Sequence, residues 1–204
     1  MAEGLNGRPG FITLRGPLPT TETEQPMSGL ITEEYRRMQE ELHRNPNYGK
    51  ASTQYAPLVA DVLKSVRPPE MLDYGAGKGR LGETLRTLLP AAEMPALRHY
   101  DPARPEWSAT PQPAPFVACI DVLEHIEPEL LDNVLDDLVR VTDGYGMFTV
   151  HTGPAVKVLA DGRNAHLIQQ PPSWWLPRFL VRFNLVVFNR MPQGFWILVE
   201  KLPA

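Results

Sequence analysis

The chain has 204 residues, of which 43% are hydrophobic, and its formal net charge is −4. This length allows one substantial core with appendages, and two full domains would be cramped. The acidic balance argues against a protein that mainly holds nucleic acid on a broad basic face. The lone Cys119 excludes an intramolecular disulfide, and residues 1–10 lack the basic start and apolar run of a secretory signal. No stretch approaches the ~20 apolar residues of a membrane-spanning helix, so we expect a soluble, cytoplasmic protein.

The N-terminal part divides into a tail and a helix. Residues 1–28 are rich in glycine, proline and threonine and poor in periodic apolar residues, which predicts a flexible tail. Thr32 is a candidate N-cap for a following amphipathic helix. The apolar positions of this helix recur at helical spacing: Ile31, Tyr35, Met38 and Leu42. We interpret residues 29–50 as a lid or docking helix and residues 51–204 as the main domain, which begins with a second helix ending at Pro68.

From Met71 onward, short apolar runs alternate with helical periodicity, which is typical of βα units in a parallel sheet. The expected strands are residues 71–74, 97–100, 116–120 and 147–150. Gly144 and Gly146 are expected to bracket the turn into the last of these strands. Residues 181–188 and 195–201 predict an antiparallel hairpin at the sheet edge. The fold class that follows is α/β, mostly parallel with an antiparallel C-terminal hairpin strand.

Three alternate glycines, Gly75, Gly77 and Gly79, mark the turn from the first strand into a helix. Glycine permits a tight turn and lets a ligand approach main-chain N–H groups. The spacing differs from the G-x-G-x-x-G of dinucleotide-binding proteins, and the Gly-Lys-Ser/Thr ending of a P-loop is missing. Asp101 ends the second strand about 20 residues later, where a carboxylate accepts hydrogen bonds from ribose hydroxyls. Alone, the glycines could form an ordinary tight connection and Asp101 a turn, but together they favour a nucleoside site.

Three segments, Leu72 to Gly79, Asp101, and Asp121 to His125, resemble in this order the class I S-adenosylmethionine-dependent methyltransferases. The resemblance covers residues 55–202 and implies a Rossmann-like, doubly wound sheet of seven strands, the last of them antiparallel. It also implies S-adenosylmethionine as the cofactor. The residues implied to contact it are Asp73, Gly75, Gly77 and Gly79 at the methionine part, Asp101 at the ribose, and Asp121 in the cleft. The stretch between Asp101 and Phe116 is too short for the usual third strand, so no adenine pocket is assigned.

Catalysis should take place after the strand at residues 116–120, because buried parallel strands carry active-site residues at their carboxyl ends. Methyl transfer from a sulfonium is an in-line displacement that needs no covalent nucleophile. What remains is removal of a proton from the acceptor, for which His125 is the candidate base. His151, after a later strand, could also face the acceptor, or it could simply end its strand with a hydrogen bond to the backbone.

Glu124 and His125, together with the distant His166, also resemble the metal-assisted O-methyltransferases, including those of ubiquinone synthesis and those that modify RNA 3′ ends. That resemblance implies a divalent ion such as Mg²⁺, Mn²⁺ or Zn²⁺ beside a diol. The alternative is a metal-free role, since the same Asp-Val-Leu-Glu-His sequence occurs widely in this superfamily without metal. Acceptor recognition is expected in residues 154–177. Trp174 and Trp175 could wall an apolar pocket there, or they could simply be large aromatic side chains buried in the core.

The sequence therefore predicts a S-adenosylmethionine-dependent methyltransferase (EC 2.1.1.-) with a small-molecule acceptor. A metal-assisted RNA or catechol-type enzyme is the alternative, and RNA binding would need basic residues such as Arg163, Arg178, Arg182 and Arg190 on one face. A non-catalytic module that binds a partner through residues 31–42 is a further class of interpretation. The sequence does not determine the acceptor, the oligomeric state or the pathway.

Overall fold

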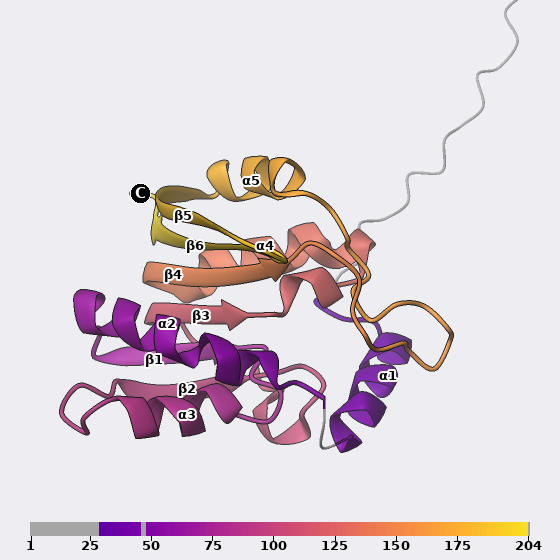
Figure 1. Cartoon of the computed structure of the whole chain (residues 1–204), viewed down its shortest axis with the longest axis horizontal. Helices are drawn as coiled ribbons and strands as arrows, with labels where there is room; N and C mark the ends of the chain where they lie inside the picture. Colours follow the sequence, from indigo (N-terminus) through magenta and orange to yellow (C-terminus); the bar gives the residue numbers. More distant parts are fainter. Residues whose placement is uncertain (1–28, 46–47, 204) are drawn as a thin grey trace, which may run out of the picture.

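The computed structural model describes residues 29–45 and 48–203, and the expected tail at 1–28 lies outside the described residues. They form a six-stranded sheet in the order β2-β1-β3-β4-β6-β5, covered by helices on both faces (Figure 1). Four strands run parallel: β1 (Glu70–Tyr74), β2 (Ala96–Tyr100), β3 (Ala114–Ile120) and β4 (Thr142–His151). β6 (Gly194–Lys201) is antiparallel to both β4 and β5 (Phe183–Met191). The α/β fold with an antiparallel C-terminal hairpin is confirmed.

The connection between β2 and β3 departs from the seven strands that the resemblance implied. It contains one short 3-10 helix, η1 (Pro105–Trp107), where a third strand and its helix would lie. Proline lacks a main-chain N–H and fixes φ, so a run that contains Pro102, Pro105, Pro111 and Pro113 is a poor partner in a strand ladder. The described part of the chain therefore has six strands and lacks the family's third strand, as the short stretch between Asp101 and Phe116 predicted.

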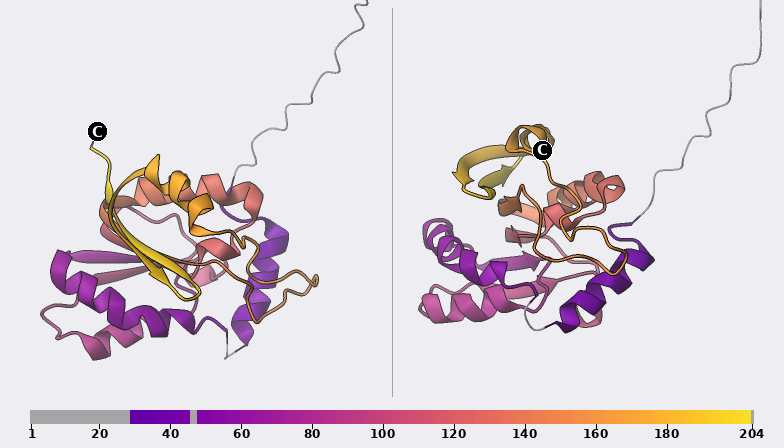
Figure 2. Two further views of the ribbon diagram at one scale, coloured as in Figure 1. Left: turned by 45° about the horizontal axis from the view of Figure 1, so that its top comes forward. Right: turned by 45° about the vertical axis from the view of Figure 1, so that its right-hand side comes forward.

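The core forms two layers, because successive side chains of each strand point to opposite faces of the sheet. One face carries Leu72, Val117 and Phe148, which pack against α4 (Leu131–Val141) and α5 (Pro172–Leu180). The other face carries Met71, Phe116 and Met147, which pack against α2 (Ala51–Val66) and α3 (Arg80–Leu88). Figure 2 shows α4 on the opposite side of the sheet from α2 and α3. The sheet is thus doubly wound, and burial on both faces explains the continuous apolar runs of its strands.

Gly144 and Gly146 lie inside β4, so the prediction that they bracket a turn before the strand is wrong. A Cβ on Gly144 would lie 2.6 Å from the carbonyl oxygen of Pro115, and one on Gly146 would lie 2.6 Å from Cζ of Phe148. Glycine in a strand often marks such a close approach of neighbouring atoms. Packing against β3 and within β4 therefore requires these glycines.

The helix α1 (Glu33–Arg44) lies across the edge of the sheet where the parallel strands end (Figure 1). Thr32 caps it as predicted, since its Oγ1 accepts a hydrogen bond from Tyr35 N at 3.2 Å. The buried Tyr35 packs with Leu159 and Ala165 from the loop between β4 and α5. The helix and this loop together border the space in front of the sheet. No described helix is long and apolar enough to cross a membrane.

Candidate functional site

A cavity of about 910 Å³ opens at the carboxyl ends of the parallel strands. Its walls come from the glycine loop after β1, the loops after β2, β3 and β4, the helix α1 and the start of α2. This volume matches the ~300–1,000 Å³ of small-molecule and cofactor sites, and the position matches the rule that open α/β sheets bind ligands at their carboxyl edge.

The glycine loop and Asp101 form one hydrogen-bonded unit in the cavity wall. Gly75 and Gly77 have φ of 77° and 55°, the left-handed region that favours glycine. Asp101 Oδ2 accepts a hydrogen bond from Gly77 N at 2.7 Å, and its Oδ1 accepts one from Ala103 N at 2.9 Å. A carboxylate has about four lone-pair sites, so two accepted N–H bonds leave capacity for ligand hydroxyls. The buried Asp101 therefore both shapes the bend and presents an acceptor at the cavity.

Asp73 and Gly79, which the resemblance placed against the cofactor, do not line the cavity. Asp73 is buried, with its Oδ2 3.4 Å from His99 Nδ1, and burial raises the pKa of the Asp73 carboxyl. Gly79 is the N-cap of α3, and a Cβ there would lie 3.0 Å from Trp107. These two residues support the loop from outside the cavity, whereas Gly75 and Gly77 line it.

Two cavity residues, His43 and Tyr48, were missed by the sequence analysis. The His43 ring covers the glycine loop, with Cε1 3.3 Å from the position of a Cβ on Gly77. The Tyr48 hydroxyl donates to Gln39 Oε1 at 3.0 Å, and Lys78 Nζ donates to Tyr48 O at 3.3 Å. A signal for His43 was present, since Tyr35, Gln39 and His43 recur every four residues and share a helix face.

His125 lies on η2 (Leu123–His125) in the cavity wall. Its Nδ1 is 2.7 Å from the carbonyl oxygen of Ala165, which makes Nδ1 the donor and leaves the lone pair on Nε2. Burial lowers the pKa of His125 to about 4. A general base is most effective when its pKa lies near the working pH, so His125 alone is a weak base at neutral pH. Its main-chain carbonyl accepts a 2.5 Å hydrogen bond from the Tyr35 hydroxyl.

His151 is the last residue of β4 and also lines the cavity. Its Nδ1 lies 3.1 Å from both N and O of Gly153, and its Nε2 lies 3.1 Å from Gln193 Oε1. Both ring nitrogens are therefore engaged. This arrangement agrees with the alternative in which His151 ends its strand with a bond to the backbone.

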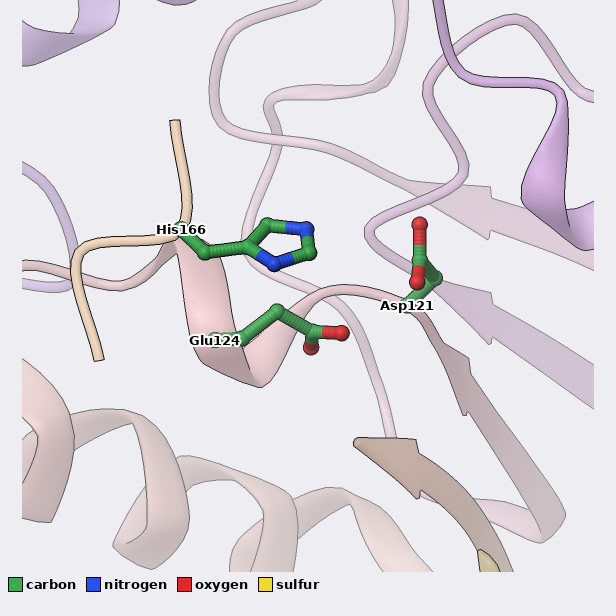
Figure 3. A group of neighbouring side chains, drawn as sticks. All are labelled: Asp121, Glu124 and His166. Carbon is green, nitrogen blue, oxygen red and sulfur yellow. The ribbon is translucent and has the colours of Figure 1, made fainter. Parts of the chain in front are cut away.

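Three side chains from separate elements, Asp121, Glu124 and His166, point toward a common space (Figure 3). Each offers a ligand atom, and these atoms lie within 4.8 Å of one another. Asp121 has φ of 60°, and its N–H donates to Thr149 Oγ1 at 2.8 Å, which fixes the turn after β3. His166 Nδ1 lies 2.7 Å from the carbonyl oxygen of Gly153, so its Nε2 carries the lone pair.

Glu124 is the most constrained member of this group. It is fully buried, its Oε1 accepts from His151 N at 2.6 Å, and its Oε2 has no hydrogen-bond partner. Burial and the nearby Asp121 raise the pKa of Glu124 well above its ordinary value. An unpaired buried carboxylate oxygen is costly, and a cation would satisfy it. A divalent ion therefore fits the group of Asp121, Glu124 and His166, while His125, the other expected ligand, is not part of it.

Of the two interpretations of the tryptophans, the structure favours burial, since neither lines the main cavity. Trp175 is fully buried in the core against Phe179, and Trp174 lies beside Arg178 in a separate, smaller pocket. Burial of a large aromatic side chain explains Trp175. The inserted segment nevertheless reaches the main cavity, through residues 154–157, 165 and 166.

Comparison with known proteins finds solved structures with a similar fold. No family profile matches the chain, and no curated protein matches it. Among solved structures, the chain resembles the Burkholderia thailandensis 1,6-didemethyltoxoflavin-N1-methyltransferase with bound 1,6-didemethyltoxoflavin and S-adenosylhomocysteine, with a TM-score of 0.60, 15% identity and coverage of 88% of this chain and 93% of that one. A putative O-methyltransferase from Nostoc punctiforme gives a TM-score of 0.55, 14% identity and coverage of 80% and 60%. The DhpI–SAH complex gives a TM-score of 0.55 and 15% identity, with coverage of 84% of this chain and 95% of that one.

These neighbours define the class of fold. The chain has the Rossmann-like fold of the class I S-adenosylmethionine-dependent methyltransferases.

Proposed function

We propose that this chain is a S-adenosylmethionine-dependent methyltransferase with a small-molecule acceptor. The observation that carries the proposal is the Asp101–Gly77 hydrogen bond, which holds a glycine bend open at the wall of a 910 Å³ cavity. When bound, the cofactor supplies an electrophilic methyl group on its sulfonium. Asp101 would hold the ribose hydroxyls, and the Gly75–Gly77 bend would leave room for the rest of the ligand.

The acceptor would lie in the part of the cavity lined by Tyr48, His125, His151 and His166. Orientation of two bound reactants supplies roughly 7–11 kcal/mol of a displacement barrier, which is the main task of such a site. The helix α1 and the β4–α5 loop border this space. The neutral His125 offers the Nε2 lone pair as a hydrogen-bond acceptor to an acceptor hydroxyl or amine.

Three observations favour a small acceptor over RNA. The cavity has the volume of a small-molecule site. The arginines that RNA binding would need include Arg163, paired with Asp161 at 2.6 Å, and Arg182, paired with Asp132 at 3.0 Å. The structurally similar 1,6-didemethyltoxoflavin-N1-methyltransferase has 1,6-didemethyltoxoflavin bound in its structure.

Calorimetry with S-adenosylhomocysteine tests the proposal. We expect the wild-type chain to bind and Asp101→Ala to bind at least tenfold more weakly, because each lost charge-assisted bond is worth about 1.5–3 kcal/mol. Asp143→Ala is the control, since Asp143 pairs with Lys201 outside the cavity. A screen of acceptors with a labelled methyl group then identifies the substrate. If the wild-type chain gave no heat and Asp101→Ala changed nothing, the non-catalytic binding module would be the better interpretation.

We further propose that Asp121, Glu124 and His166 hold a divalent cation that assists methyl transfer to oxygen. The supporting observation is the buried, unpartnered Oε2 of Glu124 within this group. A cation bound there would lower the pKa of an acceptor hydroxyl, a task for which His125, with its low pKa, is poorly suited.

Titration of the chelator-treated chain with Mn²⁺ tests the cation site. Binding should be observed for wild type and lost in Glu124→Gln, and activity should vanish with chelator and return with Mn²⁺. The matched control is Glu129→Gln, an exposed glutamate of η3 (Pro128–Leu130). Methyl transfer that is unaffected by chelator would favour the metal-free mechanism.

A further inference from the structure

Five rings form a continuous series along one wall of the cavity, which we call the ring wall: His43, Tyr48, His125, His166 and His151. Successive ring centroids are 5.4, 6.3, 4.7 and 4.7 Å apart. All four separations lie within the ~4.5–7 Å range of interacting aromatic pairs. All five side chains line the cavity, so the wall is accessible to a bound molecule.

The ring wall runs from the cofactor end of the cavity to the acceptor end. His43 covers Gly77 of the glycine loop. At the other end, His151 contacts Gln193 of the β5–β6 turn. Tyr48 lies between His43 and His125 and makes edge contacts with both rings. The part of the wall from Tyr48 to His151 therefore faces the space left for the acceptor.

Hydrogen bonds orient the four rings from Tyr48 to His151, whereas the buried Nδ1 of His43 has no hydrogen-bond partner among the described residues. The Tyr48 hydroxyl donates to Gln39, His125 is held by Ala165 O, and His166 is held by Gly153 O. Rings that are already oriented lose little conformational entropy when a ligand packs on them. A rigid ring surface favours flat, π-bearing ligands over aliphatic ones of equal size, because offset stacking and edge contacts add to simple apolar burial.

Burial keeps two rings of the wall uncharged. Burial lowers the pKa of His43, which keeps its imidazole neutral at pH 7. Burial raises the pKa of Tyr48 above its ordinary value, which keeps its hydroxyl protonated. The wall thus offers π faces and edges, and the two lysines that line the same cavity, Lys50 and Lys157, are not part of it.

We propose that the methyl acceptor is a planar aromatic or heteroaromatic compound that carries the reacting oxygen or nitrogen on its ring system. This inference rests on the proposed methyltransferase function and adds the substrate class. The plane of the acceptor would pack on Tyr48 and the neighbouring imidazoles. Its hydroxyl or amine would then lie near His125 and the group of Asp121, Glu124 and His166.

Two bicyclic alcohols of similar size test this inference on the full chain saturated with S-adenosylhomocysteine. The probes are 2-naphthol, which is flat and aromatic, and trans-2-decalol, its saturated counterpart. We expect the dissociation constant of 2-naphthol to be at least tenfold lower than that of 2-decalol. Tyr48→Leu should raise the dissociation constant of 2-naphthol about tenfold and leave that of 2-decalol nearly unchanged. Tyr48→Phe, which keeps the ring, should retain the preference for 2-naphthol.

The outcomes separate the inference from the proposed function. Equal affinity for the two alcohols, no 2-naphthol binding, or an unchanged preference in Tyr48→Leu overturns the aromatic acceptor while S-adenosylhomocysteine still binds. Loss of S-adenosylhomocysteine binding by the wild type overturns the methyltransferase proposal itself. If Tyr48→Leu does not fold, His151→Leu replaces the ring at the far end of the wall and should also lower the preference for 2-naphthol.

Discussion

Asp101 and Gly77, 24 residues apart in the chain, are joined by a 2.7 Å hydrogen bond between a carboxylate oxygen and a main-chain N–H. The bond links the end of β2 to the bend after β1. It therefore couples the proposed ribose acceptor to the shape of the glycine loop. A change at either residue should alter the affinity for the cofactor through the same contact.

Gly77→Ala should weaken S-adenosylhomocysteine binding about tenfold. Residue 77 has φ of 55°, which disfavours a Cβ, and the new Cβ would lie 3.3 Å from the His43 ring. Both the glycine bend and α1, which carries His43, must therefore shift. The left-handed conformation costs an alanine roughly 1–2 kcal/mol of stability. Calorimetry measures the affinity, and thermal unfolding measures the stability.

A matched control for this change is Gly162→Ala. Gly162 has φ of 89° with no atom within 4 Å of an added Cβ, and it does not line the cavity. We expect a similar loss of stability with no change in affinity. If both variants lost the same affinity, the effect of Gly77→Ala would come from general destabilisation and not from the loop.

Tyr35→Phe should destabilise the folded chain by about 1–3 kcal/mol. The hydroxyl of Tyr35 donates to His125 O at 2.5 Å and accepts from Gln39 Nε2 at 2.6 Å, and its removal leaves two buried polar groups without that partner. Urea unfolding measures the change. Tyr145→Phe is the control, because the Tyr145 hydroxyl takes part in no hydrogen bond within residues 29–45 and 48–203, and its loss should cost less than 0.5 kcal/mol.

The sheet and the loop–acid pair could be predicted because their signals are local. Apolar runs that alternate with helical periodicity give parallel strands, and parallel strands bring their carboxyl ends to one edge. Gly77 and Asp101 therefore had to be neighbours once each was placed after its strand. Gly144 and Gly146 were misassigned because glycine occurs both in turns and in closely packed strands. Only the contacts with Pro115 O and the Phe148 ring in the structure distinguish the two uses.

The acceptor side of the cavity could not be predicted in the same way. The ring wall draws its members from α1, the segment after it, η2, β4 and the β4–α5 loop, and no periodicity relates these segments. His166 meets Asp121 and Glu124 only because the loop folds back on Gly153 through His166 Nδ1. Asp121, which the resemblance implied at the cofactor, lines the cavity and also lies within reach of Glu124 and His166.

The low pKa of His125 predicts a loss of stability in acid. Its pKa is about 4 in the folded chain and ordinarily 6.5, so between these values the unfolded chain binds a proton that the folded chain does not. Stability therefore falls as pH drops from 6.5 toward 4 and is unaffected by this group above 6.5. His125→Asn removes the titration and keeps a side-chain N–H for Ala165 O. Unfolding at pH 7.5 and pH 5 should show a smaller loss in the variant, and equal losses would contradict the assignment.

The raised pKa of Glu124 predicts that its contribution to stability depends on pH in the opposite direction. It also predicts that the charged form needed for cation binding destabilises the metal-free chain. Its pKa lies well above the ordinary 4.5, so the folded chain retains a proton that the unfolded chain has lost, and stability falls as pH rises through this window. Glu124→Gln imitates the protonated form, keeps an acceptor for His151 N and adds an N–H donor facing Asp121. Without metal, the variant should therefore be more stable than wild type at pH 7 and no more stable at pH 4.

Addition of Mn²⁺ should reverse this order at pH 7. A cation at 100 times its dissociation constant stabilises the folded chain that binds it by about 2.7 kcal/mol. Wild type should gain this stabilisation, and Glu124→Gln should gain none, because it lacks the charged oxygen that completes the group with Asp121 and His166. Thermal unfolding with chelator and with Mn²⁺ measures both effects, with Glu129→Gln expected to follow wild type in each. A Mn²⁺ gain of equal size in Glu124→Gln would mean that the ion binds elsewhere, and the buried Oε2 would then need another explanation.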